Sequence, residues 1–243
     1  MKLLRRELLA LAAAAALGFG GLAHAQDTIR VGTDATFPPF EYSENGKRVG
    51  FDVELIEAIA KSMNKKVEWI DIDFKGLVPG LLAKRFDVAA SAIYITDERR
   101  KVVAFTDPYY PGGLVIMTKK GDTSIKGPDD LKGKKVTVQV GTKSVGYLKD
   151  NFPAVERVEV EKNQEMFQLV EVGRADAAVT GKPAAKVYAR TRGTLQVVDK
   201  QLTIEEYGYA IRKEDTELLK QFNDALKKLQ ADGTYQKLVD KYL

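Results

Sequence analysis

Apolar positions along the chain alternate between the two-residue period of a strand and the 3.6-residue period of a helix. The stretch 28–33 is β-rich, and apolar side chains from Leu55 to Met63 recur at helical spacing behind Asp52, which we expect to cap that helix. Further predicted strands cover 66–72, 88–93, 114–118, 136–140, 177–180 and 207–211. Helices are predicted over 77–84 and along the apolar face 218–229, which Gly233 ends. This alternation indicates an α/β fold.

Two pairs of segments repeat in the same order along the chain. Residues 29–34 (IRVGTD) resemble 138–143 (VQVGTK), and residues 85–91 (RFDVAAS) resemble 174–180 (RADAAVT). The repeated order predicts two related α/β lobes.

Polar residues follow the repeated strands in both halves. Ligands of open α/β sheets bind beyond the carboxyl ends of strands. We therefore expect Asp34 and Ser91 on one wall of a cleft, and Lys143 and Thr180 on the other. Such a cleft suits a small zwitterion or a polar acid that is bound by closure of the lobes.

The N-terminus has the pattern of a signal peptide. Three basic residues precede an apolar run over 8–23, and Ala23-His24-Ala25 supplies a small-x-small cleavage pattern. The alternative is a retained membrane anchor, but the run is shorter than the roughly 20 residues that span a bilayer. We therefore interpret residues 1–25 as a cleaved leader of an exported, periplasmic protein.

Composition excludes several classes of function. The formal net charge is +4, and the leader accounts for +2 through Lys2, Arg5 and Arg6 against Glu7, so the remainder carries +2. That charge is too small for a nucleic-acid binder. Cysteine is absent, and the only histidine, His24, lies in the leader. Thiolate sites, histidine-dependent triads and most transition-metal sites are thus excluded, and we expect no metal and no cofactor.

Arg99 is a candidate ligand residue, because Thr96 can cap a helix that holds this guanidinium near the end of the strand 88–93. A guanidinium there can grip a carboxylate with two hydrogen bonds, or it can be a solvated helix-end side chain. Asp34 can contact a ligand or serve a turn. A group of aromatic residues near strand ends can line a pocket or belong to the core: Phe37, Phe40, Phe74, Tyr94, Tyr109 and Tyr110.

Five ordered stretches together resemble a known family. They are VGTDATFPPF at 31–40, GFDVEL within 49–55, ITDERR at 95–100, FTDPYY at 105–110 and GTY at 233–235. The chain resembles the periplasmic polar-amino-acid-binding proteins of ABC importers (solute-binding protein family 3), and is most similar to the glutamine-binding and lysine/arginine/ornithine-binding types.

The resemblance implies a type II periplasmic-binding-protein fold, in which each lobe is a mixed sheet flanked by helices. It implies a large lobe over 27–108 and 210–243, a small lobe over 114–204, and hinge strands over 109–113 and 205–209. It also implies a monomer that delivers a small-molecule ligand to an ABC permease of the inner membrane.

The resemblance also implies roles for single residues. Arg99 would grip the ligand α-carboxylate, Phe37 and Phe74 would sandwich the ligand side chain, and Asp34 would face the polar end of that side chain. The remaining implied contacts are backbone groups of Ser91 and Ala92 on the large lobe, and Gln139, Thr142 and Lys143 on the small lobe.

Three positions depart from the family pattern. Gly181 stands where the family has an aspartate that binds the α-ammonium, Tyr94 stands where a serine or threonine is usual, and Lys143 replaces a small residue or threonine. A desolvated ammonium without a partner is costly. The amine can therefore bind elsewhere, on Asp34 or on the acids at 205–206, or the ligand can be an acid without an amine.

Three functions are compatible with these features. The first is capture of a polar amino acid or related carboxylate for an importer. The second is an enzyme of the dehydratase type, which needs a general acid in a desolvated pocket. The third is a sensor domain that signals by the same closure.

Overall fold

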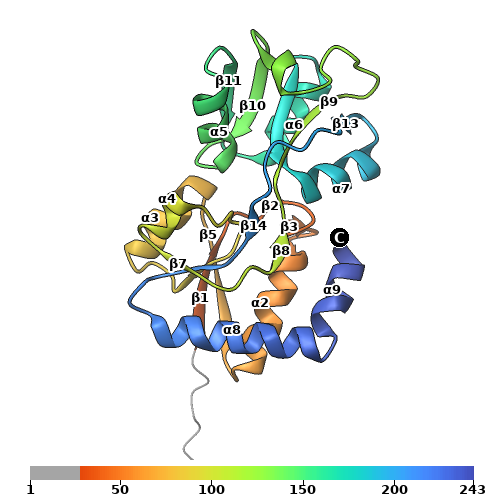
Figure 1. Cartoon of the computed structure of the whole chain (residues 1–243). Coiled ribbons are helices and arrows are strands. Elements are labelled where there is room, and N and C mark those ends of the chain that lie inside the picture. Colours follow the sequence, from red (N-terminus) through yellow and green to blue (C-terminus); the bar gives the residue numbers. More distant parts are fainter. Residues whose placement is uncertain (1–27) are drawn as a thin grey trace, which may run out of the picture.

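The computed structural model describes residues 28–243, whose main strands form two five-stranded sheets in separate lobes (Figure 1). The predicted leader over 1–25 lies outside the described residues. One lobe holds the N-terminal strands and the C-terminal helices, and the other holds the middle of the chain. The predicted α/β class and two-lobed architecture are confirmed.

The first lobe is built around the sheet β5–β1–β6–β15–β7, and its helix α2 buries Leu55, Ile56 and Ile59 completely. Its strands are β1 (Thr28–Thr33), β5 (Lys66–Asp71), β6 (Val88–Ala89), β7 (Ala104–Phe105) and β15 (Ala210–Ile211). Its helices are α2 (Phe51–Ser62), α3 (Leu77–Leu82), α4 (Asp97–Arg100), α8 (Thr216–Ala231) and α9 (Thr234–Tyr242). A small antiparallel sheet is formed by β2 (Thr36–Phe37), β3 (Glu41–Glu44) and β4 (Lys47–Val49).

The second lobe is built around the sheet β11–β10–β12–β9–β13, whose central strands are buried. Its strands are β9 (Leu114–Lys119), β10 (Lys135–Gln139), β11 (Glu156–Val160), β12 (Ala177–Gly181) and β13 (Leu195–Val197). Its helices are α5 (Lys143–Asn151), α6 (Asn163–Glu171) and α7 (Lys182–Arg192).

The two sheets share one strand arrangement. β1 lies between its parallel neighbours β5 and β6, as β10 lies between β11 and β12, and an antiparallel strand follows in each sheet. Asp87 accepts a hydrogen bond from Arg30 N at 3.1 Å, and Asp176 accepts one from Lys135 N at 2.7 Å. The same contact therefore joins corresponding strands in both lobes, and the predicted relation between the lobes is confirmed.

The first sequence repeat is nevertheless out of register by four residues. Val31 pairs with Val88, and Val136 pairs with Ala177, so Val136 is the structural counterpart of Val31. The match of IRVGTD with VQVGTK instead aligns Val31 with Val140. The second repeat is in register, because it aligns Val88 with Ala177.

This shift changes which polar residues of the two lobes are structural counterparts. Asp34 follows β1 as the counterpart of Gln139 at the end of β10, and not of Lys143. Lys143 is instead the first residue of α5.

The chain crosses between the lobes on two short strands, which lie side by side in the middle of Figure 1. β8 (Tyr110–Pro111) and β14 (Glu206–Tyr207) are antiparallel, with Tyr110 opposite Tyr207. Both lie within the segments 109–113 and 205–209.

Two predicted strands are shorter in the structure. The run 88–93 is a strand only over β6, because the chain turns at Ala92, whose φ is +42° and whose N–H binds the buried Asp52 carboxylate at 2.9 Å. The run 207–211 is interrupted at Gly208, where an added Cβ would come within 2.8 Å of Ile95.

The expected cap of α2 is also wrong. Gly50 is the N-cap, and Asp52 is the second residue of the helix. Asp52 is fully buried, and its carboxylate serves Ala92 and Tyr109 instead of the helix end.

Candidate functional site

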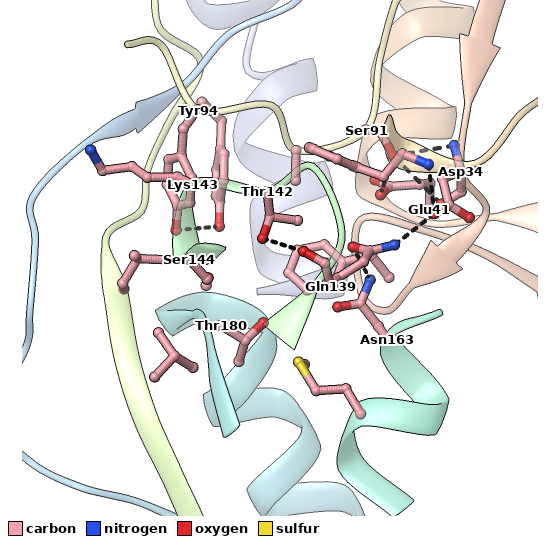
Figure 2. A pocket seen from close by; sticks show the side chains of 18 residues that line it. Asp34, Glu41, Ser91, Tyr94, Gln139, Thr142, Lys143, Ser144, Asn163 and Thr180 are labelled. Carbon is pink, nitrogen blue, oxygen red and sulfur yellow. Dashed lines mark hydrogen bonds between the residues drawn. The ribbon is translucent and has the colours of Figure 1, made fainter. Parts of the chain in front are cut away.

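A cavity lies between the lobes, at the carboxyl ends of the parallel strands of both sheets. Its open space, with the solvent at its mouth included, is about 450 Å³. Figure 2 shows Asp34 and Glu41 on one side of it, with Gln139 and Thr180 on the other. The cavity therefore has a wall from each lobe.

The aromatic candidates Phe40, Tyr109 and Tyr110 do not line this cavity, whereas all but one of the twelve residues expected to contact a ligand do. Those that line it are Asp34, Phe37, Phe74, Ser91, Ala92, Tyr94, Gln139, Thr142, Lys143, Thr180 and Gly181. The exception is Arg99.

Asp34 joins the two lobes. Its side chain is buried, and it accepts hydrogen bonds from Phe74 N at 3.2 Å and from the Thr36 hydroxyl at 3.1 Å in its own lobe. From the other lobe it accepts Gln139 Nε2 at 2.7 Å and Lys162 Nζ at 3.1 Å. Asp34 is thus more than a turn residue, because structurally equivalent side chains of the two lobes meet in the Asp34–Gln139 bond.

The partners of Asp34 are themselves held in place. Asn163 Nδ2 donates to Gln139 Oε1 at 2.8 Å, which leaves the Gln139 amide nitrogen to face Asp34. Lys162 also bridges to Asp73 at 2.7 Å, and this hydrogen bond lowers the pKa of the Asp73 carboxyl. The opposite lobe therefore closes on Asp34 with a cation and an oriented amide.

Arg99 lies beside the cavity, in a surface hollow that shares Phe74, Thr142 and Lys143 with it. Thr96 caps α4 by accepting Arg99 N at 3.2 Å, as predicted. The guanidinium donates to Tyr94 O at 2.9 Å and to Gly141 O of the other lobe at 3.2 Å, and it lies 5.6 Å from the centre of the Phe74 ring. Burial without an acidic partner lowers the Arg99 pKa to about 10.

Tyr94 and Gly181 both depart from the family pattern, and one set of contacts explains both residues. The Tyr94 and Tyr207 rings stack with centroids 4.5 Å apart, and the Tyr207 hydroxyl donates to the Tyr94 hydroxyl at 3.0 Å. An added Cβ at Gly181 would overlap the Tyr207 hydroxyl and lie 3.1 Å from the Tyr94 hydroxyl. The two phenols therefore fill the space in which a side chain at 181 would lie.

Lys143 is paired within the protein. Its ammonium lies 2.7 Å from Glu205, which follows β13 and precedes β14. Burial acts to raise the pKa of Glu205, but hydrogen bonds from Lys143 and Thr203 outweigh it, and the pKa lies below its ordinary value. The positive charge at the cavity wall is thus largely balanced.

Several residues of the site were not predicted. Lys162 and Asn163 follow β11, so the strand-end rule that found Asp34 would have found them had ERVEV over 156–160 been interpreted as a strand. Glu41 follows the apolar stretch FPPF, and nothing in the sequence marks it as buried. The other unpredicted lining residues are Leu114, Ser144, Met166, Val179 and Tyr207.

Residues 28–243 contain neither a cluster of metal-binding side chains nor a membrane-spanning helix. No cluster of three or more histidine, cysteine, aspartate or glutamate side chains there could hold a metal ion. In the same part of the chain, no helix is long and apolar enough to cross a bilayer.

Comparison with known proteins gives a consistent match over the whole described chain. The model of the bacterial extracellular solute-binding proteins, family 3, matches residues 29–243. The ABC transporter arginine-binding protein 1 of Escherichia coli (strain K12) is 35% identical over 243 residues, which cover 98% of each chain.

Two solved structures are similar in fold and sequence. An ancestral arginine-binding protein bound to arginine is 43% identical with a TM-score of 0.86, over 90% of this chain and 100% of that one. An ancestral amino acid-binding protein, described as a precursor of cyclohexadienyl dehydratase, is 43% identical with a TM-score of 0.84, over 88% of this chain and 95% of that one.

Proposed function

Because the chain belongs to family 3 of the bacterial extracellular solute-binding proteins, we propose that it captures a polar amino acid or a related small carboxylate in the periplasm and delivers it to an ABC permease. The protein acts as a monomer, and the leader over 1–25 is removed on export. The lobes are 27–108 with 210–243 and 114–204, and they move about the paired segments 109–113 and 205–209.

One observation carries this proposal: the cavity is complete only when the two lobes meet. Asp34 of one lobe is bonded to Gln139 and Lys162 of the other, and the cavity between them is lined from both sides. A solute that contacts both walls stabilises the closed arrangement over the open one, which is capture by population shift.

Cationic amino acids are the first candidate solutes. The acidic side chains that line the cavity are Asp34 and Glu41, and the aromatic rings of Phe37 and Phe74 flank the same space. Relatives of similar length bind arginine according to their names. A guanidinium or ammonium in this space would be recognised by the charge of Asp34 and by cation–π contact with the rings.

An acid without an amine is the second candidate. The observation in its favour is Gly181, because the Tyr94 and Tyr207 hydroxyls leave no room there for a carboxylate that could hold an α-ammonium. Arg99 supplies the cation that such a solute needs at the cavity edge.

A thermal-shift panel of the twenty amino acids, dicarboxylates and aromatic acids decides between these solutes. At a solute concentration of 100 times Kd, stabilisation is about 2.7 kcal/mol, and Tm of a protein of this size rises by roughly 5–10 °C. We expect L-arginine or another cationic amino acid to give the largest rise. A rise only with amine-free acids selects the second candidate, and no rise with any member contradicts the proposed function.

Arg99→Ala is expected to weaken binding of the best solute of that panel by about 10- to 100-fold, because charged hydrogen bonds contribute about 1.5–3 kcal/mol each. The variant loses the guanidinium bond that reaches Gly141 in the other lobe and the cation expected to grip the carboxylate. Isothermal titration calorimetry measures the change. Arg100→Ala, on the exposed side of the same helix, is the matched control. Full affinity in Arg99→Ala would exclude Arg99 from solute capture.

The protein is not an enzyme in this proposal. The dehydratase alternative needs a general acid placed over the substrate, and position 181 offers none. Recovery of the bound solute unchanged, checked by mass spectrometry, distinguishes capture from catalysis.

A further inference from the structure

Two acidic side chains meet behind the cavity wall. Glu41 begins β3, Asp52 lies in the first turn of α2, and both have no exposed surface. Glu41 also lines the cavity. None of the ion pairs of the described chain involves either acid. Two carboxylates without a cation cannot both be ionised in a site that excludes water.

The hydrogen-bond donors around Glu41 determine which of its oxygens is free. Asp34 N–H can only donate, and it donates to Ser91 Oγ at 3.2 Å, so the Ser91 hydroxyl can donate to Glu41 Oε1 at 2.9 Å. Glu41 Oε2 is buried and receives no donor from residues 28–243. After burial, the charge of the neighbouring Asp52 carboxyl has the largest effect in raising the pKa of Glu41. A hydrogen bond between two carboxyl groups requires a proton on one of them.

The donors around Asp52 indicate which acid is charged. Asp52 accepts hydrogen bonds from Ala92 N at 2.9 Å, from the Tyr109 hydroxyl at 2.8 Å and from the Tyr209 hydroxyl at 3.5 Å. Donors of this kind stabilise the ionised carboxylate. Glu41 receives only Ser91, so the proton belongs on Glu41 Oε2, from where it is donated to Asp52.

The remaining groups that face the pair do not supply a positive charge. Asp34 adds negative charge near Glu41. Burial raises the pKa of Asp52 to about 7 and that of Glu41 well above its ordinary value. The titratable side chains of the neighbouring elements are phenols with a raised pKa, which stay neutral: Tyr109, Tyr207, Tyr209 and Tyr235.

We propose that Glu41 and Asp52 share one proton at neutral pH, and that this proton completes a chain of hydrogen bonds that positions the cavity wall. The chain runs from Asp34 N–H through Ser91 and Glu41 to Asp52, which holds the N–H of Ala92. Ala92 has a left-handed φ of +42°, which costs energy for a side chain other than glycine. Glu41 is thus a positioning residue. Its effect on solute binding rests on the function proposed above, whereas the shared proton does not.

Glu41→Gln tests the shared proton without any solute. Glutamine accepts from Ser91 through its oxygen and donates to Asp52 through its nitrogen, and it cannot titrate. In the folded wild type, Glu41 keeps its proton. In the unfolded chain, Glu41 has the ordinary pKa of 4.5 and loses its proton above that pH. Folding stability from this group is therefore full below pH 4.5 and falls as pH rises. The unfolding constant of the variant should fall tenfold per pH unit, relative to wild type, from about pH 5 upward for as long as Glu41 stays protonated in the folded wild type.

Denaturant unfolding at several pH values measures this ratio, with Glu44→Gln on the exposed end of β3 as the control. A second readout is the infrared band of a protonated carboxyl, which should persist at pH 8 in the wild type and in Glu44→Gln and be lost in Glu41→Gln. A constant ratio across this pH range, with no such band at pH 8, overturns the proposal.

Glu41→Leu tests the positioning role with L-arginine as the probe. Leucine removes the acceptor of Ser91 and the donor to Asp52, so the affinity for L-arginine should fall at least tenfold, and Glu41→Gln should recover most of the loss. A Glu41→Gln variant that binds as weakly as Glu41→Leu would refute positioning by the hydrogen-bond chain. If the wild type does not bind L-arginine, the proposed solute is wrong, while unfolding and infrared results still decide the shared proton.

Discussion

Gly181→Asp is expected to weaken solute binding by a factor of about 1,000 or more, although it restores the acid found in the family. The new Cβ would overlap the Tyr207 hydroxyl, and Tyr207 is a fully buried ring that cannot swing away. Overpacking costs about 1–3 kcal/mol, and a desolvated carboxylate without a cation adds several kcal/mol. Closure of the lobes is therefore opposed, and calorimetric titration of the best panel solute should show the loss.

Two further variants separate overlap from other causes. Gly127→Asp adds the same carboxylate to the same lobe away from the cavity, at a position where an added Cβ meets only Lys200 at 3.7 Å, and should bind normally. Tyr207→Phe combined with Gly181→Asp removes the overlapping hydroxyl and should recover part of the affinity. Tighter binding in Gly181→Asp alone would show that the bound form keeps Tyr207 away from position 181.

Asp34→Asn is expected to weaken solute binding by about a hundredfold, which corresponds to about 3 kcal/mol. The carboxylate accepts Lys162 and Gln139 from the opposite lobe. The amide of asparagine would place its own N–H groups against the donor of Gln139 or of Lys162. It also carries no negative charge to balance Lys162. Calorimetry gives the affinity, and thermal unfolding without solute shows how far the effect extends to stability.

Asp71→Asn is the matched control for this substitution. Asp71 lies at the end of β5, and its carboxylate pairs with Arg48 while its side chain is 70% exposed. Surface ion pairs contribute at most about 1 kcal/mol, so solute binding should stay unchanged. Equal affinities in Asp34→Asn and wild type would mean that the Asp34 contacts do not form in the bound state.

The sequence allowed the strands, helices and α/β class to be predicted because apolar spacing is a local property, and the repeated segments added the two lobes. The strands β1, β10 and β12 and the helix α8 contain continuous apolar patterns, which need no knowledge of neighbours. The register of the first internal repeat was wrong because the Gly-Thr pairs at 32–33 and 141–142 occur by chance at different positions relative to β1 and β10. Only the pairings with Val88 and Ala177 reveal the correct alignment.

The candidate site was predictable as a set of residues, but not as a set of contacts. Strand ends identified Asp34 and Thr180, since the ends of parallel strands meet at one edge. Partner choice depends on distances across the cleft, which no local pattern carries. For that reason neither the pairing of Lys143 with Glu205 nor the hydrogen bond from Arg99 to Gly141 could be predicted.

Buried acidic side chains are a second feature that could not be predicted from the sequence. An isolated glutamate in a sequence is typical of the surface, and Glu41 is an exception because Ser91 and Asp52 provide its partners from distant segments. Tyr94 and Gly181 show the same dependence on context. Each departs from the family alone, and only the stacked Tyr207 ring shows that the two changes belong together.

The bridge made by Lys162 to Asp34 and Asp73 has a consequence for the timing of transport. Bonds between the lobes lengthen the residence time of the solute, because they must break before the cleft can open. The same bonds oppose unloading at the membrane, so retention and turnover place opposite demands on one lysine. Transport flux should therefore be greatest at an intermediate strength of this bridge, and a stronger bridge would retain solute at the expense of delivery.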